Sequence, residues 1–507
     1  MTDSSSTTAA SQNQRPSLTK QAIWLAIAKA LGFAFTFIFP LLLVRIVDKH
    51  HFGLYRLSFL VIATALTVIP LGVATSVYYF FPREPEKRKA VVLNIFVFHL
   101  ATGLACFLLL LAKPEILVWI SGSPELADWA GWVGFVILTW LFSSFLEALA
   151  TANEEVRYST LFIVGAQFTK GLFMLIATLW SASVQALLMA AALQGVCQSA
   201  LLLWYAHSRF SGFWRSWDFR FFRSQLVYAV PLGLAGTIYA LFDDLHQYVV
   251  GNHFGAERYA VYAVGCAQVP FVGLFRDAIG QLMIARVSYL ERHGTAKEII
   301  ALSVRVTRWL AILYCGAFFP FMVLSRELLL VLYTARYLES LPILRINLLL
   351  LLLGIAMYDP MLRAYASQRF YVLRVRLVLL LVLALALATG VSWLGMTGVV
   401  ALMVIVHLLE RVIMIRQVGR LLNASAVDWR ALGEPVLRVV CAALASGALA
   451  AAVRWLLLEK HPLVILAVCG PVYGACFVAG LWYGGVLKDE QPLIRGYLIR
   501  ARLLPRI

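Results

Sequence analysis

A chain of 507 residues that is 62% hydrophobic and only 14% charged is too apolar for a soluble protein, in which about a quarter of the residues are charged. The net charge of +17 would suit nucleic-acid binding in a soluble chain, but here the basic residues lie between long apolar runs, and we exclude a nucleic-acid partner. About fourteen of these runs can cross a bilayer as helices. The composition therefore predicts an all-α polytopic membrane protein.

In chain order, a polar, Ser- and Thr-rich segment at 1–17 comes first, and we expect a disordered cytoplasmic tail because the apolar run after it is too long for a signal peptide. Six spans are predicted at 18–44, 57–80, 90–112, 127–150, 157–180 and 184–207. After a basic loop at 208–223, six more are predicted at 224–250, 259–285, 303–325, 341–364, 373–394 and 397–419. A further pair is predicted at 435–458 and 462–486, followed by an amphipathic basic tail at 487–507.

Lys and Arg residues favour alternate connections between these spans. If the N-terminus is inside, the inward loops and tails hold about 30 of the 43 Lys and Arg residues, and the outward loops hold about 10. This bias predicts that both termini face the cytoplasm. The same basic clusters predict contacts with anionic membrane lipids.

The two halves of the chain repeat each other in order. The tripeptide His-Phe-Gly at 51–53 recurs at 253–255, and Glu147 corresponds to Asp359. Six spans per half give both halves one orientation, which is typical of two-lobed transporters. The predicted domains are two pseudo-symmetric six-helix lobes at 18–207 and 224–420 and an extra helix pair at 435–486.

Several segments resemble one family. Leu43–Val47 leading into Phe52–Tyr55, the stretch Ser224–Leu232, and Val331–Tyr333 with Leu341–Leu344 resemble bacterial polysaccharide (O-antigen-type) flippases, as far as about residue 420. These belong to the superfamily of multidrug, oligosaccharidyl-lipid and polysaccharide exporters, which have two lobes around a central cavity.

The resemblance implies a multi-pass protein of the bacterial inner membrane. It implies that a polyprenyl-pyrophosphate-linked oligosaccharide is moved from the cytoplasmic to the outer leaflet by alternating access, for surface polysaccharide biosynthesis. It implies no cofactor and no covalent chemistry. We expect a monomer, and glycan polymerase machinery is a candidate partner.

Three cations lie near the middle of predicted spans: Lys29, Lys170 and Arg276. Each costs at least about 2.5 kcal/mol near the bilayer centre, which points to a cavity, a partner or a function. Ammonium and guanidinium groups are the donors that a pyrophosphate needs, and we expect these three to bind the substrate. Lipid II flippases likewise carry cations in their first and eighth helices, which matches Lys29 and Arg276. The alternatives are a partner carboxylate or snorkelling to the interface.

Asp243 and Asp244, with His246 nearby, form a second cluster in the seventh span. These carboxylates either bind Na⁺ or a proton and couple an ion gradient to transport, or pair with Lys29 or Arg276 across the lobes.

Three further acids are assigned to ion coupling or gating. Asp277 follows Arg276 directly, but neighbours on a helix point about 100° apart, so it neutralises Arg276 only in part. Glu147 and Asp359 lie near the cytoplasmic ends of the fourth and tenth spans, where we expect them to gate or cap. His99 and His407 stand alone on apolar helices and are interpreted as core histidines.

Two other function classes remain open. A drug or cation antiporter of the same superfamily favours an acidic, aromatic cavity, which the three cations argue against. A membrane-embedded glycan polymerase, ligase or acyltransferase needs a large outer loop or a catalytic cluster, and the longest outward loop has only about 15 residues. No metal-ligand spacing or catalytic residue is predicted, so the leading interpretation is a transporter and not an enzyme.

Overall fold

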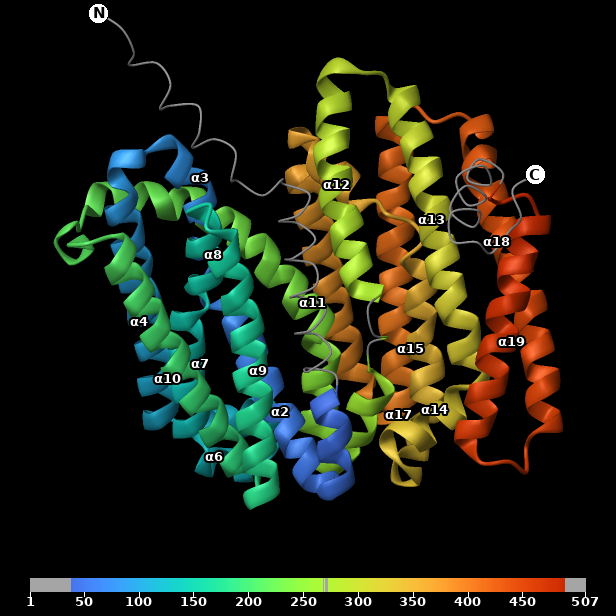
Figure 1. The fold of residues 1–507 in the computed structure, drawn as a ribbon, viewed down its shortest axis with the longest axis horizontal. Helices are drawn as coiled ribbons and strands as arrows, with labels where there is room; N and C mark the ends of the chain where they lie inside the picture. Colours follow the sequence, from blue (N-terminus) through green and yellow to red (C-terminus); the bar gives the residue numbers. More distant parts are fainter. Residues whose placement is uncertain (1–37, 268, 270–271, 488–507) are drawn as a thin grey trace, which may run out of the picture. The chain divides into compact units, whose positions relative to one another are not determined.

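The computed structural model describes residues 38–267, 269 and 272–487, and every regular element within them is a helix (Figure 1). The predicted tail at 1–17, most of the first predicted span and nearly all of the tail at 487–507 lie outside the described residues. The chain forms two compact units, Met1–Leu241 (unit 1) and Phe242–Ile507 (unit 2). The boundary falls inside one long helix, α11.

Within the described residues, ten helical segments are long and apolar enough to cross a membrane. Two of them are α11 (Phe219–Gly265, 47 residues) and α17 (Arg369–Leu421, 53 residues). A straight helix of 47 residues is about 70 Å long, more than twice the thickness of the hydrocarbon core. Gly255 (φ 78°) and Gly395 (φ 62°) interrupt the two helices, and both lie where the sequence predicts a connection between spans.

Unit 1 starts with helical residues 38–46 and ends with the first part of α11. Between them lie α2 (Lys49–Val68), η2 (Val73–Ser76), α3 (Val77–Arg83), η3 (Pro85–Lys87), α4 (Arg88–Ala112), α5 (Glu115–Ser121), α6 (Glu125–Asp128), α7 (Ala130–Ser143), α8 (Phe145–Ala152), α9 (Val156–Trp180), α10 (Val184–Arg209) and η4 (Phe213–Arg215).

The predicted span at 57–80 lies within one candidate membrane span, Lys49–Arg83, but its helix breaks between α2 and α3. Pro70 cannot donate the hydrogen bond that a helix needs, and Leu71 (φ 43°) and Gly72 (φ 70°) adopt left-handed conformations. Gly233 of α11 packs directly on this break, where a Cβ at 233 would overlap the backbone of Leu71. Because Gly233 has no side chain, the backbone of α11 can approach the break this closely.

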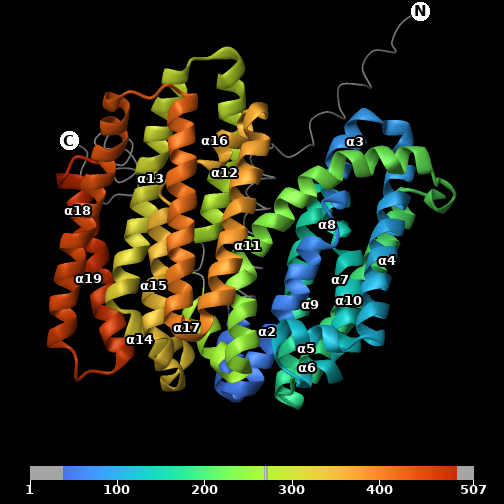
Figure 2. The ribbon, with the colours of Figure 1, turned by 180° about the vertical axis from the view of Figure 1, so that it is seen from behind.

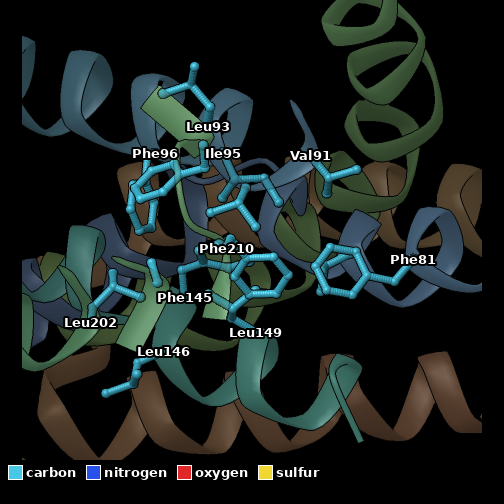
Figure 3. Packing of buried hydrophobic residues seen from close by; sticks show 14 of the residues in the cluster. Phe81, Val91, Leu93, Ile95, Phe96, Phe145, Leu146, Leu149, Leu202 and Phe210 are labelled. Carbon is cyan, nitrogen blue, oxygen red and sulfur yellow. The ribbon is translucent and has the colours of Figure 1, made fainter. Parts of the chain in front are cut away.

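Aromatic rings from several helices fill the core of unit 1 (Figure 3). Phe81 of α3, Phe96 of α4, Phe145 of α8 and Phe210 after α10 are all at most 6% exposed. The rings of Phe96 and Phe145 meet edge to face at 5.8 Å. This packing fixes α3, α4, α8 and the end of α10 against one another.

Unit 2 contains the second part of α11 and the rest of the chain. Its elements are α12 (Val272–His293), α13 (Ala296–Val323), α14 (Ser325–Tyr333), η5 (Ala335–Ser340), α15 (Leu341–Leu353), α16 (Asp359–Ala364), η6 (Ala366–Gln368), α17, α18 (Ala426–Leu456) and α19 (Pro462–Tyr483). Two predicted spans are interrupted here: 259–285, between Gly265 and Val272, and 341–364, between Leu353 and Asp359.

The extra helix pair, α18 and α19, packs on itself and on α13 within unit 2, as both views show (Figures 1 and 2). Arg454 of α18 donates two hydrogen bonds to the Glu327 carboxylate of α14, at 2.8 and 3.0 Å. On α19, the Tyr473 hydroxyl donates to the Cys315 carbonyl of α13. Polar bonds thus add to the apolar contacts that join the pair to unit 2.

The two copies of the repeated tripeptide differ in local structure, because Gly53 lies inside α2 whereas Gly255 lies at the break in α11. Glu147 and Asp359 each lie on a short helix, α8 and α16, that precedes a long one, α9 and α17.

Candidate functional site

Lys170 of α9 lies in unit 1 against an aromatic face. Its Nζ is 4.3 Å from the centre of the Trp140 ring of α7, and the Trp140 indole N–H donates to the Ala191 carbonyl of α10. The hydrogen bond fixes the ring, and the ring face attracts the ammonium. No ion pair of Lys170 is found among the described residues. Among the described residues, the alternative that a carboxylate neutralises Lys170 therefore has no support.

Asp243 lies close to His407, which the sequence predicts to be a core histidine. Its Oδ1 lies 3.4 Å from Nε2 of His407, which is on the second part of α17. The His407 ring stacks on Phe242 with a centroid distance of 4.8 Å and an interplanar angle of 19°. His407 is buried and hydrogen-bonded, as expected of a core histidine, but its ring also faces a carboxylate.

Two hydrogen bonds connect residues on either side of the break at Gly255. His246 Nδ1 and the Tyr262 hydroxyl are 2.5 Å apart. The Gln247 amide donates to Asp244 at 3.1 Å and accepts from the Tyr259 hydroxyl at 3.2 Å. The polar residues before the break are thus tied to two tyrosines after it.

The other predicted residues of this region are described only in part. Arg276 is exposed in the first turns of α12 and lies within electrostatic reach of Asp243. Both residues belong to unit 2, so this interaction is within one unit and not across the lobes. Lys29 and the side chain of Asp277 lie outside the described part of the chain.

Asp359 begins α16 and is held by two arginines. Its carboxylate pairs with Arg363 at 2.6 Å and with Arg376 at 3.0 Å. Arg376 also binds Glu410, whose side chain is 1% exposed, at 2.9 Å. The network joins α16 to both parts of α17.

Arg411, next to Glu410, closes the break between α15 and α16. Its guanidinium donates to the Ala356 carbonyl at 3.3 Å and lies 4.6 Å from the centre of the Tyr358 ring. A carbonyl freed by a helix break needs such a donor when it is away from water. Glu147, which the predicted repeat pairs with Asp359, is exposed on α8 and lies within electrostatic reach of Tyr78.

Glu410 and His407 are not recognisable from hydropathy as members of polar clusters, and Arg376 and Arg411 count there only among the basic residues that indicate orientation. One signal was available, because His407, Glu410 and Arg411 fall within five positions of an apolar segment, on neighbouring turns of one helix. Their partners on α11 and α16 are far away in the sequence, and no local pattern identifies them.

A family of polysaccharide biosynthesis proteins matches residues 42–342, which is more than half of the chain. The chain belongs to this family. The resemblance to polysaccharide flippases drawn from the sequence is thereby confirmed. No curated protein matches the sequence.

Solved structures with the same fold are transporters of the MOP superfamily. A multidrug-resistance MATE transporter in an inward-facing conformation is 12% identical, with a TM-score of 0.59, covering 79% of this chain and 96% of its own. A MATE transporter of Vibrio cholerae is 13% identical, with a TM-score of 0.58, covering 82% and 99%.

The lipid II flippase MurJ in an inward-closed conformation is also 13% identical, with a TM-score of 0.56. This similarity covers 91% of this chain and 99% of the flippase, so it includes more of the chain than either MATE similarity. At these identities the likeness concerns the fold. This member of the polysaccharide biosynthesis family has the fold of these transporters, and the ten long apolar helices among its described residues make it a multi-pass membrane protein.

Proposed function

We propose that the protein moves a polyprenyl-pyrophosphate-linked oligosaccharide from the cytoplasmic to the outer leaflet of a bacterial inner membrane. The observation that carries the proposal is the family match over residues 42–342, which associates the chain with polysaccharide biosynthesis, on a fold that a lipid II flippase also has. Surface polysaccharides, including O-antigen and exopolysaccharide, are the products that such a step serves.

In this proposal the chain crosses the membrane fourteen times with both termini inside, and it acts as a monomer. The lobes at 18–207 and 224–420 work by alternating access around a cationic cavity, and the pair at 435–486 is an addition to them. Lys29, Lys170 and Arg276 bind the pyrophosphate. Asp243, Asp244, Asp277, Glu147 and Asp359 couple an ion to the cycle or gate it.

Lys170 is the described residue that best supports an anionic substrate. A cation in a membrane helix that meets an aromatic face retains unused hydrogen-bond donors, since an ammonium has three. A pyrophosphate offers acceptors and opposite charge, and their attraction is stronger in a low-dielectric site than in water.

The test uses the purified protein in liposomes with a fluorescent polyprenyl-pyrophosphate disaccharide, whose outer-leaflet fraction is read by quenching with a membrane-impermeant reductant. We expect the wild type to move the lipid between leaflets and Lys170→Gln to do so about tenfold more slowly, the effect of losing one charge-assisted hydrogen bond. The matched control is Lys113→Gln, because Lys113 is exposed at the end of α4.

Liposomes that leave this lipid in place but export a cationic dye would overturn the proposal and favour the drug antiporter. Cells that lack the protein should accumulate the same class of lipid intermediate and lose the surface polymer. Unchanged lipid extracts together with an intact surface would contradict the proposal as well.

A further inference from the structure

His407 is placed so that both of its ring nitrogens face hydrogen-bond acceptors. Nδ1 is 3.2 Å from the Met403 carbonyl oxygen, and Nε2 is 3.4 Å from the Asp243 carboxylate. A neutral imidazole has one N–H and can donate only one of these bonds, whereas an imidazolium donates both. The acceptors that surround the ring thus suit its protonated form.

The two members of the pair differ in how far the protein covers them. The His407 side chain is 10% exposed and lies against Phe242, which is fully buried, whereas the Asp243 side chain is 44% exposed. Asp243 is therefore the less covered member of the pair. Asp243 is on the part of α11 before Gly255, and His407 is on the part of α17 after Gly395, so the pair joins two separate helical segments.

The other charged and titratable groups around the pair have bonds or neighbours of their own. On α11, His246 bonds to Tyr262 and Asp244 to Gln247. On α17, Glu410 holds Arg376, and Arg411 bonds to the carbonyl of Ala356.

Two groups act electrostatically on the pair. Arg276 of α12 and His246, when it is charged, stabilise the Asp243 carboxylate. His246 also lies within electrostatic reach of His407. From α16, Asp359 and Arg363 bond to each other. Asp243 is the carboxylate that meets the ring directly.

We propose that Asp243 and His407 form a proton-binding site that couples proton uptake to movement of α11 against α17. A proton from water adds to Nε2 of His407, and no other bond is made or broken. The protonated ring donates a charge-assisted hydrogen bond to Asp243 and holds the two segments together. In the neutral form with its N–H on Nδ1, the Nε2 lone pair faces the carboxylate, and the contact loosens.

The coupling rests on the proposed function, but the proton site can be tested without any transport. The full-length protein in nanodiscs, with no sugar lipid present, is taken from about pH 8 to about pH 5, the range in which histidine changes charge, and the protons bound per chain are counted with a pH dye. We expect His407→Gln to bind about one proton fewer than the wild type. His99→Gln is the matched control, since His99 is fully buried in an apolar core that disfavours a charged ring.

A second variant keeps the test decisive if His407→Gln does not fold. Asp243→Asn has nearly the same volume and removes the charge that stabilises the imidazolium, and we expect its proton to bind at a lower pH than in the wild type. A variant that merely lost a structural contact would melt earlier with an unchanged proton count. Equal proton binding by the wild type and folded His407→Gln, or proton binding at an unchanged pH in folded Asp243→Asn, overturns the proposal.

The flippase assay then separates the two proposals. If the proton binds as expected but the wild type moves no sugar lipid, the proposed function fails and the proton site stands. If the wild type moves the lipid and His407→Gln moves it equally well with and without a pH gradient, translocation stands and coupling through this site is contradicted.

Discussion

At the scale of single residues, Asp48 shows how one side chain secures the start of a membrane helix. Its carboxylate accepts from the His51 backbone N–H at 2.8 Å and lies 2.9 Å from the His51 ring. The backbone hydrogen bond from His51 is the largest cause that holds the pKa of Asp48 below its ordinary value of 3.8. The ionised cap thus stabilises the fold fully above the unfolded-state pKa, and this contribution is lost as pH falls through the lower folded-state pKa.

We expect Asp48→Ala to lower the stability at neutral pH by about 1 kcal/mol, the usual loss for an N-cap. Asp48→Asn keeps an acceptor and cannot titrate, so it should retain most of the stability and lose this part of the acid sensitivity. Thermal unfolding in detergent between neutral and acidic pH measures both. Equal losses for the two variants would contradict the capping role.

Gly233 is a second residue whose effect can be predicted. Because a Cβ at this position would overlap the backbone of Leu71, Gly233→Ala must push α11 away from the break between α2 and α3. We expect a loss of about 1 to 3 kcal/mol, as for other overpacked sites. Gly236→Ala is the control one turn later, since nothing lies within 4 Å of its Cβ position. Similar melting temperatures for the two variants would show that the contact is loose.

At the scale of elements, the pair of Glu327 and Arg454 tests how α18 is held. Glu327 is 1% exposed, and Arg454 is its ion-pair partner from another helix. We expect Arg454→Met to cost about 3 to 5 kcal/mol, because it leaves a buried carboxylate without its counter-charge. The double variant with Glu327→Gln should recover much of this loss, and a double-mutant cycle on unfolding free energies measures the coupling. Additive losses would mean that the pair does not act as a unit.

Hydropathy predicted the helices well and their interruptions only in part. The apolar runs predicted for α4, α9, α10, α13 and α19 match helices that are long and apolar enough to cross a membrane. The break before α3 has a local sequence signal, Pro70 and Gly72. The mean hydropathy of a whole span does not detect it. The break at Gly354–Tyr358 has a weaker signal, because the donor that closes it, Arg411, comes from another part of the chain.

At the scale of the whole molecule, the charge bias predicts which connections face the cytoplasm. In a variant without native cysteines, a cysteine at Ser181, after α9, should react with an impermeant maleimide added to intact cells. A cysteine at Ser211, after α10, should react only after the membrane is opened. Both serines are exposed, so access to the reagent depends on the side of the membrane. The reverse labelling pattern would invert the proposed orientation.

The sequence supplied the class of the molecule and some of its polar residues, but not how those residues pair. Charges in apolar runs are conspicuous because each is costly there, which is how Lys170 and Asp243 were selected. Their neighbours Trp140 and His407 belong to other helices, and the packing of those helices decides the contacts. Composition indicates a membrane protein, and the family match and the transporter fold make that class more specific. The contacts of Lys170 with Trp140 and of Asp243 with His407 are known only from the structure.

The bond between Glu327 and Arg454 also has a consequence for biogenesis. The two residues are 127 positions apart, so at roughly 5 to 20 residues per second the ribosome needs on the order of 6 to 25 seconds to make the partner of the acid. During that time α14 must be shielded by the insertion machinery or by a bound proton. A nascent chain that terminates early exposes this unpaired acid, a feature by which proteases that survey the membrane could recognise incomplete molecules.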